Sequence, residues 1–300
     1  MKAVKNFLSY VEISTKIASV LPFLVGTGYT VFRYGSLKPK QTLIFFVAML
    51  LFDMTTTAIN NHVGHRQTGR QPHYSCLASL MIIFAMGVSA AVLGVYLASI
   101  SSVVILLAGI LCFGMGVIYS YGFLPIARTP FGELFSGATM GVFIPFIAVE
   151  LNYPMIDISL PDFGRLVITA DWLELICFGI IIVPLICCIA NIMLANNICD
   201  VEEDVRVKRY TLPFYIGVGK ALLVYKLLYI ATYLFIAVGA ILRIIPLFTL
   251  AVLLTAIPVK RNVARFMELQ DKRQTFFTVI QNFLTITVPY AACIWIGCFL

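Results

Sequence analysis

The sequence predicts an all-α, polytopic transmembrane bundle of about nine helical spans. Of its 300 residues, 61% are hydrophobic and 12% are charged, against about 25% charged in an ordinary soluble domain. The mean hydropathy of +0.97 agrees with this imbalance. Residues 76–127 contain no Asp, Glu, Lys or Arg, and such a stretch is too long for any helix of a soluble protein. We therefore expect most of the chain to lie in lipid.

The spans are apolar runs of about 17 to 25 residues that end at polar or Pro/Gly breaks. The eighth is the weakest, because Pro246 and Pro258 bracket a short apolar stretch. Residues 1–14 have neither the continuous apolar core nor the small-residue cleavage site of a signal peptide, so the first span is expected to direct insertion. We predict a single transmembrane domain over residues 1–300, with spans near 14–33, 41–61, 76–98, 102–122, 131–151, 173–196, 218–241, 243–259 and 276–298.

The basic residues predict the orientation. With the amino terminus inside, 15 of the 21 Lys and Arg residues lie on the cytoplasmic side. We expect a multi-pass protein of the cytoplasmic membrane, with its active site where the loops 62–75, 123–130, 197–217 and 260–275 gather on that side. Residues 152–172 are expected to form a cap on the other side. The net charge of +7 follows from this topology and not from nucleic-acid binding, because no basic stripe alternates with aromatic residues.

Residues 196–204, NNICDVEED, follow the sixth span and carry the strongest chemical signal. On a helix, Asn196, Asp200 and Asp204 are spaced i, i+4, i+8 and share one face. An amide and two carboxylates at this spacing suit Mg²⁺, which takes one or two carboxylates plus water and phosphate oxygens. Three basic residues that follow are suited to bind the far side of a diphosphate: Arg206, Lys208 and Arg209. The alternative is a solvated acidic turn that caps the helix.

The end of the second span echoes this segment. Residues 58–68, AINNHVGHRQT, repeat the Asn pair, but Gly64 and Thr68 stand where Asp200 and Asp204 stand. Because both spans end on the same side, we expect both pairs to face one cavity. His62, His65 and His73 lie in or beside this echo with Arg66. They are interpreted as a positive surface for an anionic substrate, with a transition-metal site or a solvated loop as alternatives.

Two further segments contribute polar groups. Asp53 lies inside the second span, two helical turns before Asn60 and on the same face. An acid inside a membrane indicates function, although a helix-packing hydrogen bond to Thr or Tyr is an alternative, as is an ion pair with Lys226. In YSYGFLPIARTPFGE, residues 119–133, two prolines end the helix and Arg128 projects from the loop. Glu133 is interpreted as a cap of the next span.

These segments resemble the UbiA-type intramembrane aromatic prenyltransferases, most of all those that act on the naphthoate precursor of menaquinone. The resemblance rests on TKIASVLPFLVGT in span one, TTAINN in span two, PIARTPFGELFSG after span four and NNICDVEEDVRVKRYTLP after span six. It implies a nine-span fold that binds a polyprenyl diphosphate and an aromatic acceptor such as 1,4-dihydroxy-2-naphthoate at the lipid bilayer. It also implies Mg²⁺-assisted departure of the diphosphate and formation of demethylmenaquinone.

The resemblance, together with the residues discussed above, defines the predicted site. The catalytic residues are Asn60, Asn196, Asp200 and Asp204, of which the last three are expected to bind Mg²⁺. The substrate-binding residues are Asp53, Asn61, Arg66, Tyr119, Arg128, Asn197, Lys208 and Arg209. The acidic positions of the family's first motif are Asn61, Gly64 and Thr68 here, and His62 replaces its tyrosine.

Two other functions remain as hypotheses. The first keeps the fold but not the chemistry, as a catalytically degenerate protein that binds a quinone or an isoprenoid. The second is a secondary transporter, whose polar residues would have to line a path at the bilayer midplane.

Overall fold

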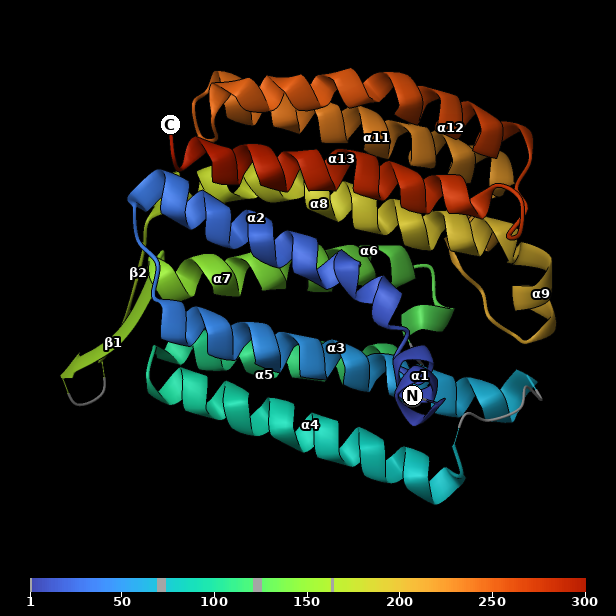
Figure 1. Ribbon diagram of the computed structural model, residues 1–300, viewed down its shortest axis with the longest axis horizontal. Coiled ribbons are helices and arrows are strands. Elements are labelled where there is room, and N and C mark those ends of the chain that lie inside the picture. Colours follow the sequence, from blue (N-terminus) through green and yellow to red (C-terminus); the bar gives the residue numbers. More distant parts are fainter. Residues whose placement is uncertain (1, 69–73, 121–125, 163–164) are drawn as a thin grey trace.

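The computed structural model describes residues 2–68, 74–120, 126–162 and 165–300, and Figure 1 shows a bundle of long helices lying side by side. Within these ranges, eight helical segments are long and apolar enough to cross a membrane, and Val103–Gly116 is a shorter apolar helix. The all-α prediction is confirmed, apart from one hairpin. The long helices are α2 (Ile17–Tyr34), α3 (Pro39–Thr68), α4 (Cys76–Ser99), α5 (Val103–Ser120), α8 (Trp172–Cys199), α11 (Val218–Ile241) and α13 (Phe276–Gly297).

Two more long segments are composite. The segment that corresponds to the fifth predicted span joins α6 (Gly132–Ala138), the π-helical η3 (Thr139–Phe143) and α7 (Ile144–Asn152). The other joins the 3₁₀-helix η4 (Leu247–Thr255) to α12 (Ala256–Glu268). The remaining helices are short: α1 (Lys2–Tyr10), η1 (Ile13–Lys16), η2 (Ile126–Arg128), α9 (Val201–Arg206) and α10 (Leu212–Ile216).

The predicted limits of the eighth span, 243–259, are wrong. The helix begins after Pro246 and continues to Glu268, through residues that the sequence analysis assigned to a loop. Pro258 does not end the helix because it lies in the first turn of α12, where a missing N–H costs little. Beyond it, Val259, Val263 and Phe266 are buried on one face. This apolar face packs into the main apolar cluster and so stabilises the end of the helix, whose opposite face carries the exposed Lys260, Arg261 and Arg265. The helix α3 likewise continues to Thr68, past the predicted loop start at 62.

A hairpin occupies the end of the bundle where a cap was predicted. Strands β1 (Ile156–Asp162) and β2 (Arg165–Ala170) pair antiparallel, with Ile156 opposite Ala170. Asp171 then caps α8 by accepting a hydrogen bond from the Glu174 N–H at 3.2 Å. Figure 1 shows the hairpin at the opposite end of the bundle from α9.

The buried interior has α8 at its centre. The largest apolar cluster joins α8 to α2, α11, α12 and α13, through residues such as Leu185, Tyr225, Phe266 and Ile286. A second cluster joins α2, α3, α5 and α7. The outer faces are also apolar, since Leu77, Phe84 and Leu254 are 70%, 72% and 72% exposed. Exposed leucines and phenylalanines along the length of a bundle indicate contact with lipid.

Candidate active site

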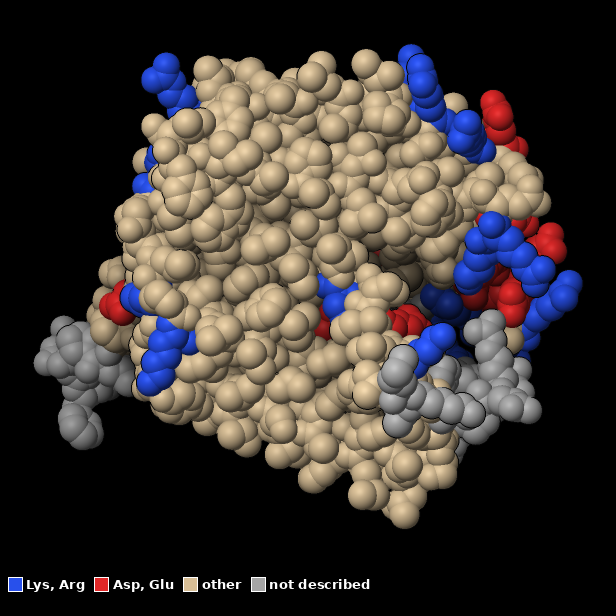
Figure 2. Space-filling model, in the orientation of Figure 1, with Lys and Arg blue, Asp and Glu red and all other residues tan. Residues whose placement is uncertain are grey.

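Charged side chains gather at the α9 end of the bundle. Figure 1 places α1, the end of α3, the start of α6 and α9 at this same end. In Figure 2, acidic and basic side chains crowd there, and some lie recessed in a hollow of the surface. The segments that follow the second and the sixth spans therefore end on one side of the bundle, as the two-motif prediction requires.

The predicted i, i+4, i+8 spacing is present in the structure. The helix α8 ends at Cys199, and α9 begins at Val201 after a single junction residue, Asp200. The Asp200 N–H donates to the Asn196 carbonyl at 3.1 Å, and the Asp204 N–H donates to the Asp200 carbonyl at 2.8 Å. One helical turn thus separates each residue from the next, so the amide and the two carboxylates follow one face.

A buried chain of polar contacts lies behind this face. The Asn197 amide Nδ2 donates to Glu133 Oε1 at 2.8 Å, and Arg209 Nη2 donates to Asn197 Oδ1 at 3.0 Å. Arg209 Nη1 also lies 3.5 Å from Asp204 Oδ1. Asn197 is 0% exposed and Glu133 only 6%. Asn197 therefore orients Arg209, and Glu133 in turn orients Asn197.

The sequence analysis missed this role of Glu133. It interpreted Glu133 as a helix cap, but α6 has no side-chain cap and the carboxylate bonds to α8 instead. The available signal was an acid at the start of an apolar span, at the same membrane end as the Asn pair. Its partner depends on the packing of α6 against α8, which a single sequence does not reveal.

Two glycines allow that packing. A Cβ atom on Gly141 would lie 2.8 Å from the Ile186 Cα, and one on Gly137 would lie 3.2 Å from the Ile186 carbonyl oxygen. Side chains at these positions would push α6 and η3 away from α8. The glycines thus bring the two helices close enough for Glu133 to reach Asn197.

A lysine that the sequence analysis left outside the site contacts Asp200. The Lys272 ammonium, from the segment between α12 and α13, is hydrogen-bonded to Asp200 Oδ2. Its side chain is 53% exposed, and that of Asp200 is 12% exposed. The sequence had placed Lys272 only among the cations on the cytoplasmic side.

The loop that precedes α6 is joined to the segment that follows α9. The Tyr210 N–H donates to the Arg128 carbonyl at 3.1 Å. This bond brings η2 beside Arg209, so two predicted diphosphate-binding residues lie on neighbouring segments. Lys208 is exposed in the turn that joins α9 to Arg209, where its φ is 56°. The Tyr119 side chain lies outside the described residues.

Two buried carboxylate oxygens at this end of the bundle are suited to contact a cation. Among the described side chains, three carboxylate oxygens are buried without a hydrogen-bond partner: Asp204 Oδ2 and Glu133 Oε2 lie at this end, and Glu150 Oε1 lies near the hairpin. Burial raises the pKa of the Asp204 carboxyl, while the Arg209 guanidinium opposes that shift. In the described part of the chain, no three His, Cys, Asp or Glu residues gather as metal ligands. A divalent ion held by Asp200 and Asp204 would fill the rest of its shell with water and phosphate oxygens, as Mg²⁺ does.

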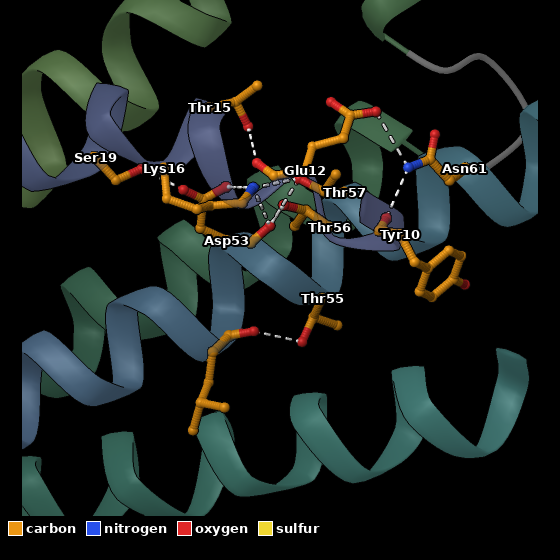
Figure 3. Close-up of polar contacts among 11 residues, drawn as sticks. Tyr10, Glu12, Thr15, Lys16, Ser19, Asp53, Thr55, Thr56, Thr57 and Asn61 are labelled. Carbon is orange, nitrogen blue, oxygen red and sulfur yellow. Dashed lines mark hydrogen bonds and ion pairs between the residues drawn. The ribbon is translucent and has the colours of Figure 1, made fainter. Parts of the chain in front are cut away.

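The first motif is held differently. The Asn61 amide Nδ2 donates to the Tyr10 carbonyl at 2.8 Å and to Glu12 Oε1 at 3.2 Å, as Figure 3 shows. Asn61 thus fixes the amino-terminal segment to the end of α3. Asn60 is exposed, and His62 Nδ1 lies 2.9 Å from Ser79 Oγ. The side chains of Arg66 and His65, and all of His73, lie outside the described residues.

Asp53 has a partner that the sequence analysis did not foresee. Lys16 Nζ donates to Asp53 Oδ1 at 2.8 Å and to Thr57 Oγ1 at 2.5 Å, and the Ser19 hydroxyl donates to Asp53 Oδ2 at 2.5 Å (Figure 3). Lys16 is 4% exposed and Asp53 8%. The suggested pairing of Asp53 with Lys226 is wrong, because Lys226 is exposed on α11. Asp53 ties α3 to the start of α2.

Comparison with known proteins decides the family. The model of the UbiA prenyltransferase family matches residues 19–286. The chain belongs to the UbiA prenyltransferase family. Among its UbiA relatives is the 1,4-dihydroxy-2-naphthoate octaprenyltransferase of Bacillus subtilis (strain 168), which is 29% identical over 223 residues. That alignment covers 68% of this chain and 63% of the relative, so the chain spans less than two thirds of the relative's length.

Solved UbiA structures share the fold. A UbiA homolog from Archaeoglobus fulgidus bound to GPP and Mg²⁺ matches with a TM-score of 0.67 and 13% identity, over 98% of this chain and 100% of that one. The apo UbiA homolog from Aeropyrum pernix K1 matches with a TM-score of 0.66 and 16% identity, over 96% and 98%. A digeranylgeranylglyceryl phosphate synthase matches with a TM-score of 0.66 and 13% identity, over 99% of each chain. The predicted UbiA-like fold and family are confirmed.

The contacts of Glu133 lead to a first testable prediction for this UbiA-family chain. Glu133→Gln keeps an oxygen that accepts from Asn197 but removes the negative charge, whereas Glu133→Ala removes both. We expect Glu133→Ala to lower the free energy of unfolding by about 1–3 kcal/mol, because it leaves the buried Asn197 amide unpaired. The Gln variant should lose less than half of that, as measured by unfolding in mixed micelles. An equal loss in both variants would show that the charge, and not the acceptor, stabilises this contact.

Proposed function

We propose that this protein transfers a polyprenyl group from an isoprenyl diphosphate to an aromatic quinone precursor, 1,4-dihydroxy-2-naphthoate, giving the hydroquinone form of demethylmenaquinone. The single observation that carries the proposal is the unpartnered, buried Asp204 carboxylate oxygen beside Arg209, one helical turn from Asp200. Such an arrangement suits a divalent cation and an anionic phosphate together.

In this proposal, the acidic residues bind the metal and the basic residues bind the diphosphate. Asp200 and Asp204, with the Asn196 amide, would hold Mg²⁺, which when bound stabilises negative charge on the departing diphosphate. Arg128, Lys208 and Arg209 would bind diphosphate oxygens, and the hydrogen bonds of Asn197 and Glu133 fix the direction of Arg209. The prenyl tail would lie along apolar surface, where each CH₂ contributes about 0.8 kcal/mol without specific contacts.

The reaction needs no protein nucleophile. The allylic C–O bond breaks, the diphosphate leaves with the electron pair, and the electron-rich ring attacks the carbocation. The ring carbon that forms the new bond then loses its carboxylate as CO₂, whose bonding electrons restore the aromatic ring. The protein supplies a pocket shielded from water, because water would otherwise capture the carbocation.

The relatives support this assignment. One bears the name of a 1,4-dihydroxy-2-naphthoate octaprenyltransferase, and two solved structures of a UbiA homolog from Archaeoglobus fulgidus are described as bound to GPP and Mg²⁺ and to DMAPP and Mg²⁺. We further propose that the protein lies in the cytoplasmic membrane with its amino terminus and its site on the cytoplasmic side, as the distribution of 15 of the 21 basic residues favours.

A direct assay tests the proposal. The purified protein in lipid nanodiscs is incubated with dihydroxynaphthoate, Mg²⁺ and octaprenyl diphosphate, and both the prenylated product and released diphosphate are quantified. We expect equimolar amounts of the two, and none with excess EDTA. The matched acceptor control is 4-hydroxybenzoate, which should react at least about tenfold more slowly, since one or two missing polar contacts cost that much.

One observation favours a second candidate, a binding protein without turnover. The Asn61 amide is occupied by the amino-terminal segment, and Gly64 and Thr68 supply no acid to this half. This candidate predicts saturable binding of octaprenyl diphosphate with no diphosphate release and no product. In that case Gly64→Asp should leave release at zero, whereas in a weakened enzyme it should increase the rate.

A further inference from the structure

The segment between α12 and α13 is held by hydrogen bonds that do not involve its lysine side chain. Asp271 Oδ1 accepts from the Arg273 N–H at 2.9 Å and from the Gln274 N–H at 2.7 Å. The Thr275 hydroxyl donates to the Leu269 carbonyl at 2.7 Å. Residues 269–275 therefore form a fixed platform, from which the flexible stem of Lys272 extends to Asp200.

The position of the Lys272 ammonium conflicts with a metal on the same carboxylate. It is bonded to Asp200 Oδ2, an oxygen that the proposed function gives to Mg²⁺. Two like charges at one carboxylate repel each other, so the ammonium and the metal compete. Without a metal, Lys272 has a clear electrostatic role. Asp200 and Asp204 are like charges one turn apart, and Lys272 neutralises the more exposed of the two.

Lys272 is suited to move. Its side chain is 53% exposed, so only part of its surface is buried before it leaves Asp200. A diphosphate that enters with the metal brings a higher negative charge than the carboxylate that Lys272 gives up. An ammonium with three donors on a flexible stem can then turn from the carboxylate to the diphosphate oxygens.

We propose that Lys272 exchanges partners during substrate binding: it neutralises Asp200 in the empty site and binds the diphosphate once the metal has taken that carboxylate. This inference rests on the proposed function, because it assigns Asp200 to the metal. It adds a diphosphate-binding cation from the last third of the chain, far in sequence from the acidic segment.

The test uses binding, so it does not depend on turnover. Mn²⁺ binding to the full-length protein in nanodiscs is measured by electron paramagnetic resonance at fixed ionic strength, without substrate. Lys272→Gln should bind Mn²⁺ about two- to fivefold more tightly, because a competing half-exposed ion pair contributes that much. Arg273→Gln is the matched control, since it removes the same charge from an exposed neighbour that makes no ion pair in the described structure. Its Mn²⁺ affinity should not change.

In the second measurement, the same substitution is expected to weaken binding instead of strengthening it. With Mn²⁺ saturating, calorimetric titration with inorganic pyrophosphate should show Lys272→Gln binding about tenfold more weakly than the wild type, the loss expected for one charge-assisted hydrogen bond. Arg273→Gln should again match the wild type, and Lys272→Arg should recover most of the affinity. Unchanged or weaker Mn²⁺ binding by Lys272→Gln, or unchanged pyrophosphate binding, would overturn the exchange. If the wild type binds Mn²⁺ and pyrophosphate but forms no product, the proposed function fails and the exchange stands.

Discussion

Asp204→Asn is expected to lower kcat/KM for prenyl transfer by about 10² to 10³-fold, the usual loss when one charge-stabilising group is removed from an active site. Asparagine has nearly the same shape and retains an oxygen for the Arg209 guanidinium, which lies 3.5 Å from Asp204 Oδ1. What it loses is the negative charge of a carboxylate that is 5% exposed and has one unpartnered oxygen. The variant should also bind Mn²⁺ more weakly.

The neighbouring acid supplies the control for this prediction. Glu203 is exposed on the same short helix, and its replacement by glutamine removes the same charge from the same turn. We expect Glu203→Gln to keep at least about half of the wild-type kcat/KM, since exposed charges are screened by solvent and salt. Activity of Asp204→Asn within about threefold of Glu203→Gln would remove Asp204 from the proposed mechanism.

The second large effect concerns stability. Lys16→Met is expected to lower the free energy of unfolding by about 3–5 kcal/mol, because it leaves a buried carboxylate without its cation. Lys16 and Asp53 are 4% and 8% exposed, and their charged atoms lie 2.8 Å apart (Figure 3). Ser19 continues to donate to Asp53 in the variant, but a hydroxyl does not neutralise the charge. Denaturation in mixed detergent micelles, followed by tryptophan fluorescence, measures the loss.

A double variant separates the ion pair from simple packing. Replacing both residues, as Lys16→Met with Asp53→Leu, removes the charges together and should restore at least half of the lost stability. Lys5→Met is the exposed control on α1 and should change the stability by less than about 0.5 kcal/mol. If the double variant were less stable than Lys16→Met alone, the loss of stability would come from packing and not from the uncompensated charge of Asp53.

Local periodicity explains which parts of the site the sequence predicted. The face shared by Asn196, Asp200 and Asp204 requires only that helical turns continue past the end of span six, and the i→i+4 hydrogen bonds across the junction of α8 and α9 show that they do. Arg209 follows within the same stretch of chain, so its nearness to Asp204 was also foreseeable. The carboxyl-terminal end of span eight was not predicted, because the charges on the exposed face of this amphipathic helix lower its hydropathy and give it the appearance of a loop.

The sequence by itself determined the membrane fold and the gathering of polar motifs at one end, because apolar run length and helical spacing are local properties. Only the tertiary structure decided the partners: Glu133 for Asn197, Lys16 for Asp53 and Lys272 for Asp200. Each of these contacts joins segments distant in the chain. The contact of Glu133 forms because glycines such as Gly141 let α6 approach α8. The buried charges of Lys16 and Asp53 pair because a charge removed from water must find an opposite charge or a hydrogen bond.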